Sequence, residues 1–146
     1  VIMLKGIPPL LQPELLKVLA EMGHGDEIVI GDANFPATAM GTRCIRCDGH
    51  RVTDIVSAIL QVFPLDSFVE APVALMQVVP GSMQGEPPIW ADFRKIVHQY
   101  EPEAKLEFIE RFAFYDRSKQ AFATIQTGET ALYACIILKK GVLTDH

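Results

Sequence analysis

The sequence lacks the features that mark several large classes of protein. Among its 146 residues, 13 Lys and Arg stand against 18 Asp and Glu, which gives a formal net charge of −5. A nucleic-acid backbone is bound by a concentrated basic face, and the composition offers no surplus of positive charge for one. No apolar run approaches the roughly 18 residues that a membrane-spanning helix requires. We therefore expect no nucleic-acid partner and no membrane contact.

Cysteine is also scarce. The three residues Cys44, Cys47 and Cys135 cannot all pair, and their spacing does not suggest a disulfide framework. Cys44 and Cys47 form a C-x-x-C in a stretch typical of a strand, where residues three apart point to opposite faces. A zinc site would need a second pair of ligands as well. Because residues 1–5 also lack the pattern of a secretory signal, we expect reduced cysteines, no metal and a cytoplasmic protein.

Several catalytic motifs are missing too. The sequence contains no glycine-rich phosphate loop, no nucleophile elbow and no metal-binding motif. ATP-driven, NAD-linked and serine-hydrolase chemistry therefore have no support.

What the sequence does have is apolar content. Hydrophobic residues make up 49% of the chain, and its mean hydropathy is +0.22. A chain of this length normally forms one domain with a sizeable core. Since no membrane segment uses the apolar surplus, we expect part of it to be buried in contacts between subunits.

The spacing of apolar residues, Pro and Gly predicts alternating helices and strands. We expect helices over residues 13–22, 53–63 and 89–100, and a short helical turn over 115–119. Strands are expected over 27–31, around Ile45, and over 73–79, 106–109, 122–126 and 132–138. Residues 127–129 are compact enough for a hairpin turn between the last two strands. The alternation predicts one α/β domain, residues 1–146, with helices on the faces of a mixed sheet.

Two polar clusters are candidates for chemistry. His24 lies between glycines just after a predicted helix, and Asp32 lies just past the end of the following strand. A histidine titrates near neutrality and can both give and take a proton, while strand ends in α/β sheets are common ligand sites. An equally weighted alternative is that His24 only complements the helix C-terminus.

The second cluster spans residues 111–117. Arg111 and Tyr115 lie between aromatic residues, which suits a sugar-facing wall and equally a subunit contact. Tyr133, in a predicted apolar strand, needs a partner for its hydroxyl if it is buried. That partner could be backbone, water or ligand.

Longer segments of the chain resemble the RbsD/FucU family. The resemblance rests on residues 3–7, on Pro13–Glu27 with its Met-Gly-His-Gly-Asp-Glu run, on Arg-Phe-Ala-Phe-Tyr at 111–115, and on Ile-Leu-Lys-Lys-Gly at 137–141. It runs from about residue 3 to residue 142 and is strongest to the branch that acts on L-fucose. The ribose branch is expected to have histidine where this chain has Arg111.

The resemblance implies a fold and an activity. The fold would be a three-layer α/β/α domain with a mixed central sheet. The activity would be sugar mutarotation, an isomerase reaction that interconverts the α and β anomers of L-fucose without a cofactor. The family's assembly implies a homo-oligomer, a decameric ring, with sites near the subunit boundaries.

The resemblance also assigns residues. His24 matches the catalytic proton donor, with Tyr115 as a second proton relay or a stacking wall. Asp32, Arg111 and the segment from Tyr133 to Cys135 match substrate-binding positions, and Asp66 is a further contact. The family usually reads Tyr-Gly-Asn where this chain reads Tyr-Ala-Cys at 133–135. Cysteine cannot supply the amide donor and acceptor of asparagine, so the sugar contact at Cys135 differs.

Three other functions fit the same sequence. The enzyme could exchange the forms of ribose or another monosaccharide. A non-catalytic sugar-binding accessory protein would bind one anomer and leave the exchange rate unchanged. A purely structural ring-forming protein would show no sugar-dependent thermal shift.

Overall fold

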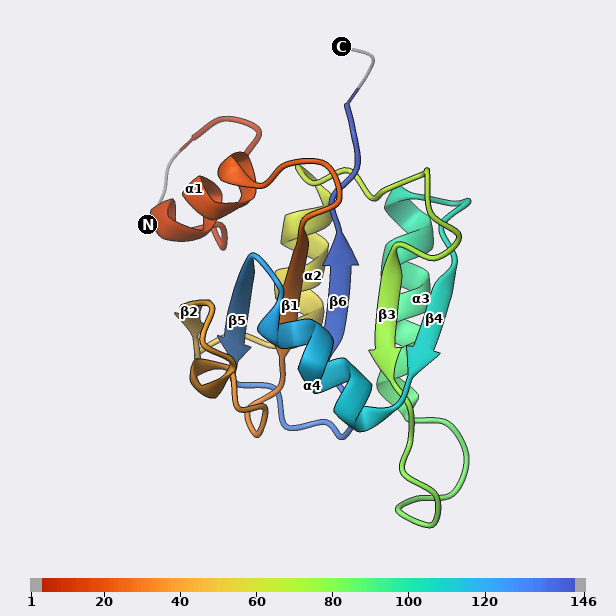
Figure 1. Ribbon diagram of the computed structural model, residues 1–146. Coiled ribbons are helices and arrows are strands. Elements are labelled where there is room, and N and C mark those ends of the chain that lie inside the picture. Colours follow the sequence, from red (N-terminus) through yellow and green to blue (C-terminus); the bar gives the residue numbers. More distant parts are fainter. Residues whose placement is uncertain (1–3, 144–146) are drawn as a thin grey trace.

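The computed structural model describes residues 4–143 and contains a six-stranded mixed sheet with four α-helices (Figure 1). The strand order is β2-β5-β1-β6-β3-β4. In chain order the elements are α1 (Pro13–Glu21), β1 (Glu27–Gly31), the 3-10 helix η1 (Thr38–Met40), β2 (Arg43–Cys47), α2 (Val52–Leu60), β3 (Val73–Met76), α3 (Pro88–Tyr100), β4 (Leu106–Ile109), α4 (Arg111–Lys119), β5 (Ala123–Thr127) and β6 (Ile136–Lys139).

Strand β1 lies inside the sheet and pairs with the last two strands of the chain. It runs parallel to β5 and antiparallel to β6. The predicted hairpin at residues 127–129 is therefore wrong, because β1 separates the two strands that the hairpin would have joined. The mixed sheet predicted from the sequence is confirmed.

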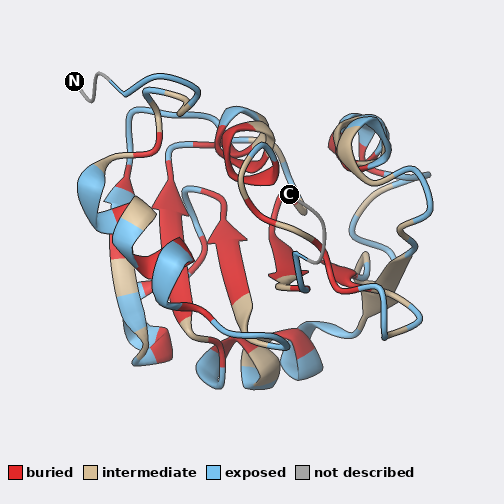
Figure 2. Ribbon diagram, turned by 90° about the horizontal axis from the view of Figure 1, so that it is seen from above, coloured by how far each residue is buried: buried red, intermediate tan, exposed pale blue. Residues whose placement is uncertain are grey.

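The sheet has a helical layer on each face. Helices α2 and α3 lie behind the sheet in Figure 1, and α4 crosses in front of it. Alternate residues of β1 point to opposite faces of the sheet. Ile28 and Ile30 belong to the large core beneath α1, α2 and α3, and Val29 belongs to a smaller core beneath α4. Figure 2 shows buried strands in the interior, with exposed residues on the outer sides of the helices.

Cysteines Cys44 and Cys47 point to opposite faces of β2, as predicted. Cys44 packs against the smaller core and Cys47 belongs to the large one. All three cysteines are free thiols. Within residues 4–143, no group of three or more His, Cys, Asp or Glu side chains is placed to hold a metal ion. In the same part of the chain, no helix is both long and apolar enough to cross a membrane.

Helix α4 is longer than the short turn predicted from the sequence. It begins at Arg111 because the Glu110 carboxylate accepts the backbone N–H groups of Phe112 and Ala113 at 2.9 and 3.0 Å. These N–H groups have no partner within the helix, so the side chain caps the N-terminus.

Helix α4 has only two buried residues, Phe114 and Ser118. Burial of a Phe side chain contributes about 1.5–3 kcal/mol. The helix is also tied to the sheet by Arg117, which bonds Glu27 of β1 and Glu107 of β4. The hydrogen bond to Glu27 is the main cause that raises the pKa of Arg117. Two carboxylates thus fix the position of α4 over the sheet.

Candidate active site

The turn after β1 fixes Asp32 at the edge of the sheet. A Cβ atom at Gly31 would lie 2.6 Å from the ring of Phe35, so only glycine lets that ring fold back over the strand end. The Asn34 N–H donates to the Asp32 carboxylate at 3.0 Å. The Phe35 N–H donates to the Asp32 carbonyl at 3.1 Å.

The Asp32 carboxyl is 9% exposed. Burial raises its pKa, while backbone N–H groups of Asn34, Phe35 and Ala134 and the thiol of Cys135 partly oppose this rise. Removal from water penalises the charged form, and N–H donors favour it. A carboxyl poised in this way can accept hydrogen bonds from sugar hydroxyls.

Two more predicted residues reach this edge from α4. Tyr115 packs against Phe35, with ring centroids 5.9 Å apart. Arg111 lies at the first position of α4, its guanidinium 4.6 Å from the ring centre of Phe112. Since Glu110 caps this helix, the cap also positions Arg111.

Tyr133 and Cys135 come from the segment before β6. The prediction that Tyr133 lies inside a strand is wrong: β6 begins at Ile136, and Tyr133 has a left-handed backbone with φ 57°. Its hydroxyl accepts from the Val79 N–H at 3.0 Å and lies 2.6 Å from the Ser82 hydroxyl. Of the three partners left open from the sequence, the structure shows backbone, and the Ser82 hydroxyl is a second partner that was not among them. Burial is also the main cause that raises the pKa of the Cys135 thiol, helped by the Asp32 carboxylate.

These five residues line one cavity of about 390 Å³. Its complete lining is Asp32, Asn34, Phe35, Met76, Val79, Ser82, Arg111, Tyr115, Leu132, Tyr133 and Cys135. Sequence reasoning did not single out Val79, Ser82 or Leu132. The strands predicted over 73–79 and 132–138 included Val79 and Leu132, but β3 ends at Met76 and β6 begins at Ile136, so both residues lie outside the strands. Ser82 lies in a Pro/Gly-rich loop, which gives no periodic signal.

His24 and Asp66 lie elsewhere. Nε2 of His24 is 3.1 Å from Oδ1 of Asp66, and that oxygen also accepts the Phe68 N–H at 3.0 Å. An ionised carboxylate can only accept hydrogen bonds, so Nε2 donates and Nδ1 of His24 is left for other partners. The sequence placed neither Asp66 nor Phe68 beside His24, because 42 residues separate Asp66 from it.

The loop that carries His24 is held by the chain segment after β6. The Gly25 N–H donates to the Lys140 carbonyl at 2.9 Å, and the Lys140 ammonium donates to the carbonyls of Leu19 and Met22. The sequence left open that His24 only complements the C-terminus of α1. In the structure Lys140 binds the carbonyls at that end of the helix. The His24 side chain is 47% exposed.

The Asp66 carboxyl has a lowered pKa. Its burial raises the pKa, but the Phe68 N–H, the hydrogen bond with His24 and the charges of His24 and Lys139 outweigh that effect. Asp66 is therefore a stable anionic partner for His24.

The two groups lie at opposite ends of β1. His24 precedes the first residue of the strand and Asp32 follows the last, so the strand alone separates them by roughly 15 Å. Within one chain, the structure brings Asp32, Arg111, Tyr115, Tyr133 and Cys135 together and places His24 with Asp66 apart from them.

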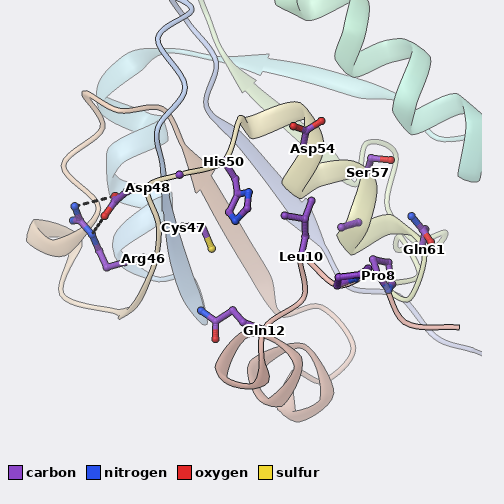
Figure 3. A pocket seen from close by; sticks show the side chains of 13 residues that line it. Pro8, Leu10, Gln12, Arg46, Cys47, Asp48, His50, Asp54, Ser57 and Gln61 are labelled. Atoms are coloured by element: carbon purple, nitrogen blue, oxygen red, sulfur yellow. Dashed lines mark hydrogen bonds and ion pairs between the residues drawn. The ribbon is translucent and has the colours of Figure 1, made fainter. Parts of the chain in front are cut away.

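A larger cavity, about 760 Å³, lies beside α2, between the segment before α1 and the turn after β2 (Figure 3). Polar side chains line it, including His50, Asp54 and Ser57. None of the residues in either group belongs to it. The smaller cavity is the better candidate site, because it joins a desolvated carboxyl, a guanidinium and a phenol.

Known proteins resemble this chain over nearly its whole length. Residues 5–143 match the model of the RbsD / FucU transport protein family. The chain is 48% identical to the fucose mutarotase of Homo sapiens, over 96% of this chain and 94% of that protein.

Solved structures are similar over the whole fold. The fucose mutarotase of Streptococcus pneumoniae in complex with L-fucose is 45% identical, with a TM-score of 0.90 over 97% of this chain and 100% of that one. Bacillus subtilis RbsD complexed with D-ribose is 28% identical, with a TM-score of 0.72 over 98% of this chain and 100% of that one. The chain is therefore a member of the RbsD/FucU family.

Proposed function

We propose that this protein is an L-fucose mutarotase, an isomerase that interconverts the α and β anomers of the free sugar. The observation that carries the proposal is the 390 Å³ cavity, where Asp32, Arg111 and Tyr115 converge. Carboxylate and guanidinium groups supply acceptors and donors for hydroxyl groups, and the aromatic rings suit the C–H faces of a sugar. The relative that binds L-fucose and the relatives named fucose mutarotase support the choice of sugar.

The chemistry requires only proton transfers. The ring oxygen gains a proton while the anomeric hydroxyl loses one, the ring opens to the aldehyde, and rotation before closure gives the other anomer. In our proposal His24 is the general acid/base: Asp66 holds Nε2, and Nδ1 exchanges the proton with the sugar. Tyr115 is the second relay or a stacking wall. Asp32 and Arg111 bind sugar hydroxyls.

Because His24 lies far from the cavity of its own chain, we propose that two copies complete each site. Exposed apolar side chains flank both groups: Phe68, 75% exposed, lies beside His24, while Phe112 and Leu132 are 60% and 62% exposed near the cavity. Two different surfaces that bind each other form a heterologous contact, and such contacts generate a ring when the rotation between copies closes. The apolar surplus of the sequence fits such contacts.

The family's decameric ring is the assembly we expect, formed by a cytoplasmic protein with one domain over residues 1–146. The free thiols fit a reducing compartment. Sedimentation velocity measures the assembly directly. A monomer in solution would overturn the shared site.

Anomer exchange of L-fucose followed by saturation-transfer NMR tests the function. We expect wild-type protein to accelerate exchange, and His24→Ala to lose about 10²–10⁴-fold of that acceleration, the usual contribution of a general acid/base. Tyr115→Phe measures the share of the second group. His50→Ala, an exposed histidine in the other cavity, is the matched control and should keep full activity.

Two outcomes would contradict the proposal. Undiminished exchange in His24→Ala removes the acid/base assignment. Faster exchange of D-ribose than of L-fucose at equal concentration removes the choice of sugar.

A further inference from the structure

The hydroxyl of Tyr133 closes a ring of hydrogen bonds with the segment that follows β3. The Val79 N–H donates to the phenol oxygen at 3.0 Å, and the Ser82 hydroxyl lies 2.6 Å from the same oxygen. The Ser82 hydroxyl also donates to the Val79 carbonyl at 2.7 Å.

The donors and acceptors of this ring can be assigned. Ser82 has one hydroxyl proton, which goes to the Val79 carbonyl, so its oxygen accepts the proton of Tyr133. The Tyr133 hydroxyl thus donates to Ser82 and accepts from Val79. Its proton is already committed and is not free for a sugar hydroxyl, which leaves the ring of Tyr133 as its contribution to the cavity.

Tyr133 is also held from its backbone. The indole N–H of Trp90, in α3, donates to the Tyr133 carbonyl at 3.0 Å. Tyr133 has a left-handed backbone, φ 57°, which is unfavourable for a residue other than glycine and persists where neighbouring groups enforce it. Tyr133 therefore joins the β3–α3 connection to the segment before β6.

Val79, Ser82 and Tyr133 all line the 390 Å³ cavity. Here the connection between β3 and α3 forms one wall, and Val79 to Ser82 has no strand or helix to fix it. The backbone N–H of Ser82 donates to the Val79 carbonyl at 3.0 Å and closes the turn, and the ring of hydrogen bonds attaches this turn to Tyr133.

We propose that Ser82 is a positioning residue that, through the Tyr133 hydroxyl, holds the wall Val79–Ser82 in place around the sugar. The effect on the sugar rests on the proposed function, whereas the hydrogen-bond ring itself does not. Loss of the Ser82 hydroxyl leaves the Tyr133 proton without an acceptor and frees the wall. Sugar binding then weakens, while proton transfer by His24 is unchanged.

Exchange kinetics of Ser82→Ala and Ser82→Thr test the effect on the sugar. For Ser82→Ala we expect KM for L-fucose to rise about 2- to 10-fold, the range for one net hydrogen bond, with kcat unchanged. Ser82→Thr keeps the hydroxyl and should restore KM. Ser57→Ala, in the other cavity, is the matched control. A fall in kcat with KM unchanged, or no rescue by Thr, would overturn the proposal.

A measurement without sugar tests the ring itself. Amide hydrogen exchange of Val79 should be about 10-fold faster in Tyr133→Phe and in Ser82→Ala than in wild type, with similar melting temperatures. If the Val79 amide exchanged equally slowly in all three proteins, the ring of hydrogen bonds would not hold this segment. If wild-type protein did not accelerate anomer exchange, the proposed function would be wrong. The hydrogen-exchange measurement would still show whether the ring of hydrogen bonds forms.

Discussion

The two ends of strand β1 carry different kinds of chemistry. At its start, His24 is half exposed, pairs with an anionic carboxylate and has Phe68 uncovered beside it. At its end, Asp32 is buried in a cavity with a guanidinium and a phenol, and burial raises its pKa. One end is suited to proton exchange and the other to sugar binding.

Neither end of β1 holds both the histidine and the sugar-binding groups. Among residues 4–143, no histidine lines the 390 Å³ cavity, and His24 lies away from it. Apolar side chains are exposed near both ends, as the proposed contact between copies requires. We expect function to depend on the contact between copies as much as on either end.

Mutations that remove one end of β1 in each of two chains are expected to have the largest effect. His24→Ala and Tyr115→Phe are each expected to be impaired alone. When the two proteins are mixed, unfolded and refolded together, about a quarter of the sites should contain both wild-type groups, because each site draws on two copies at random. Saturation-transfer NMR would detect the recovered activity.

A mixture of His24→Ala with His24→Ala,Tyr115→Phe is the control and should stay inactive. If the site lay within one chain, the first mixture would recover nothing. That result would contradict the shared site and leave the mutarotase assignment to be judged on the wild-type rate.

The carboxyls at the two ends of β1 are expected to affect stability with opposite pH dependence. Asp32 has a raised pKa and Asp66 a lowered one, relative to the ordinary value of 3.8. Above pH 3.8 the unfolded state ionises more readily than folded Asp32, so Asp32 costs stability there, and the cost disappears below that pH. Asp66 instead stabilises the fold above pH 3.8, and that contribution is lost as the pH falls through its lowered pKa.

Melting temperatures between pH 2 and 7 would show the opposite signs. Relative to wild type, Asp32→Asn should gain stability as the pH rises above 3.8. Asp66→Asn should lose stability relative to wild type as the pH rises from 2 towards 4. Parallel pH profiles of the two variants and wild type would contradict the assigned environments. Asp92→Asn, on the exposed face of α3, is the control.

The smallest expected effect concerns the thiol in the cavity. Because burial and Asp32 raise the pKa of Cys135, its thiol should stay protonated and unreactive at pH 8 in the folded protein. Titration with a thiol reagent should give the same fast-reacting signal for wild type and Cys135→Ser. A fast signal that disappears in Cys135→Ser would show that the cavity end is open and well hydrated.

Much of the fold follows from local sequence patterns. The buried run of β1 and the apolar faces of α1 and α3 were predicted close to their observed bounds. The length of α4 was predicted too short for two reasons. Only Phe114 and Ser118 are buried, so the helix has a weak apolar pattern, and its N-cap is Glu110, which is not among the preferred capping residues. The predicted hairpin between β5 and β6 was wrong because both strands pair with β1 instead of with each other. Nothing in the local sequence indicates this pairing.

The sequence predicted which residues to consider for the site, but it did not predict how they are arranged in space. Asp32, Arg111, Tyr115, Tyr133 and Cys135 do line one cavity. The distance between His24 and that cavity follows from the direction of β1, and the pairing of His24 with Asp66 follows from contacts made by Lys139 and Lys140. Such contacts between distant segments have no signature in one sequence.

The strand order has a consequence for how the protein is made on the ribosome. Strand β1 is synthesised before β2, β3 and β4, yet both of its partners, β5 and β6, are synthesised after them. Pairings between distant segments form slowly because they close long loops. The nascent chain must therefore keep β1 unpaired until β5 and β6 have emerged, and the β1 edges are exposed to other nascent chains during that time. We expect this protein to need protection by chaperones during synthesis more than a fold of equal size whose strands pair in sequence order.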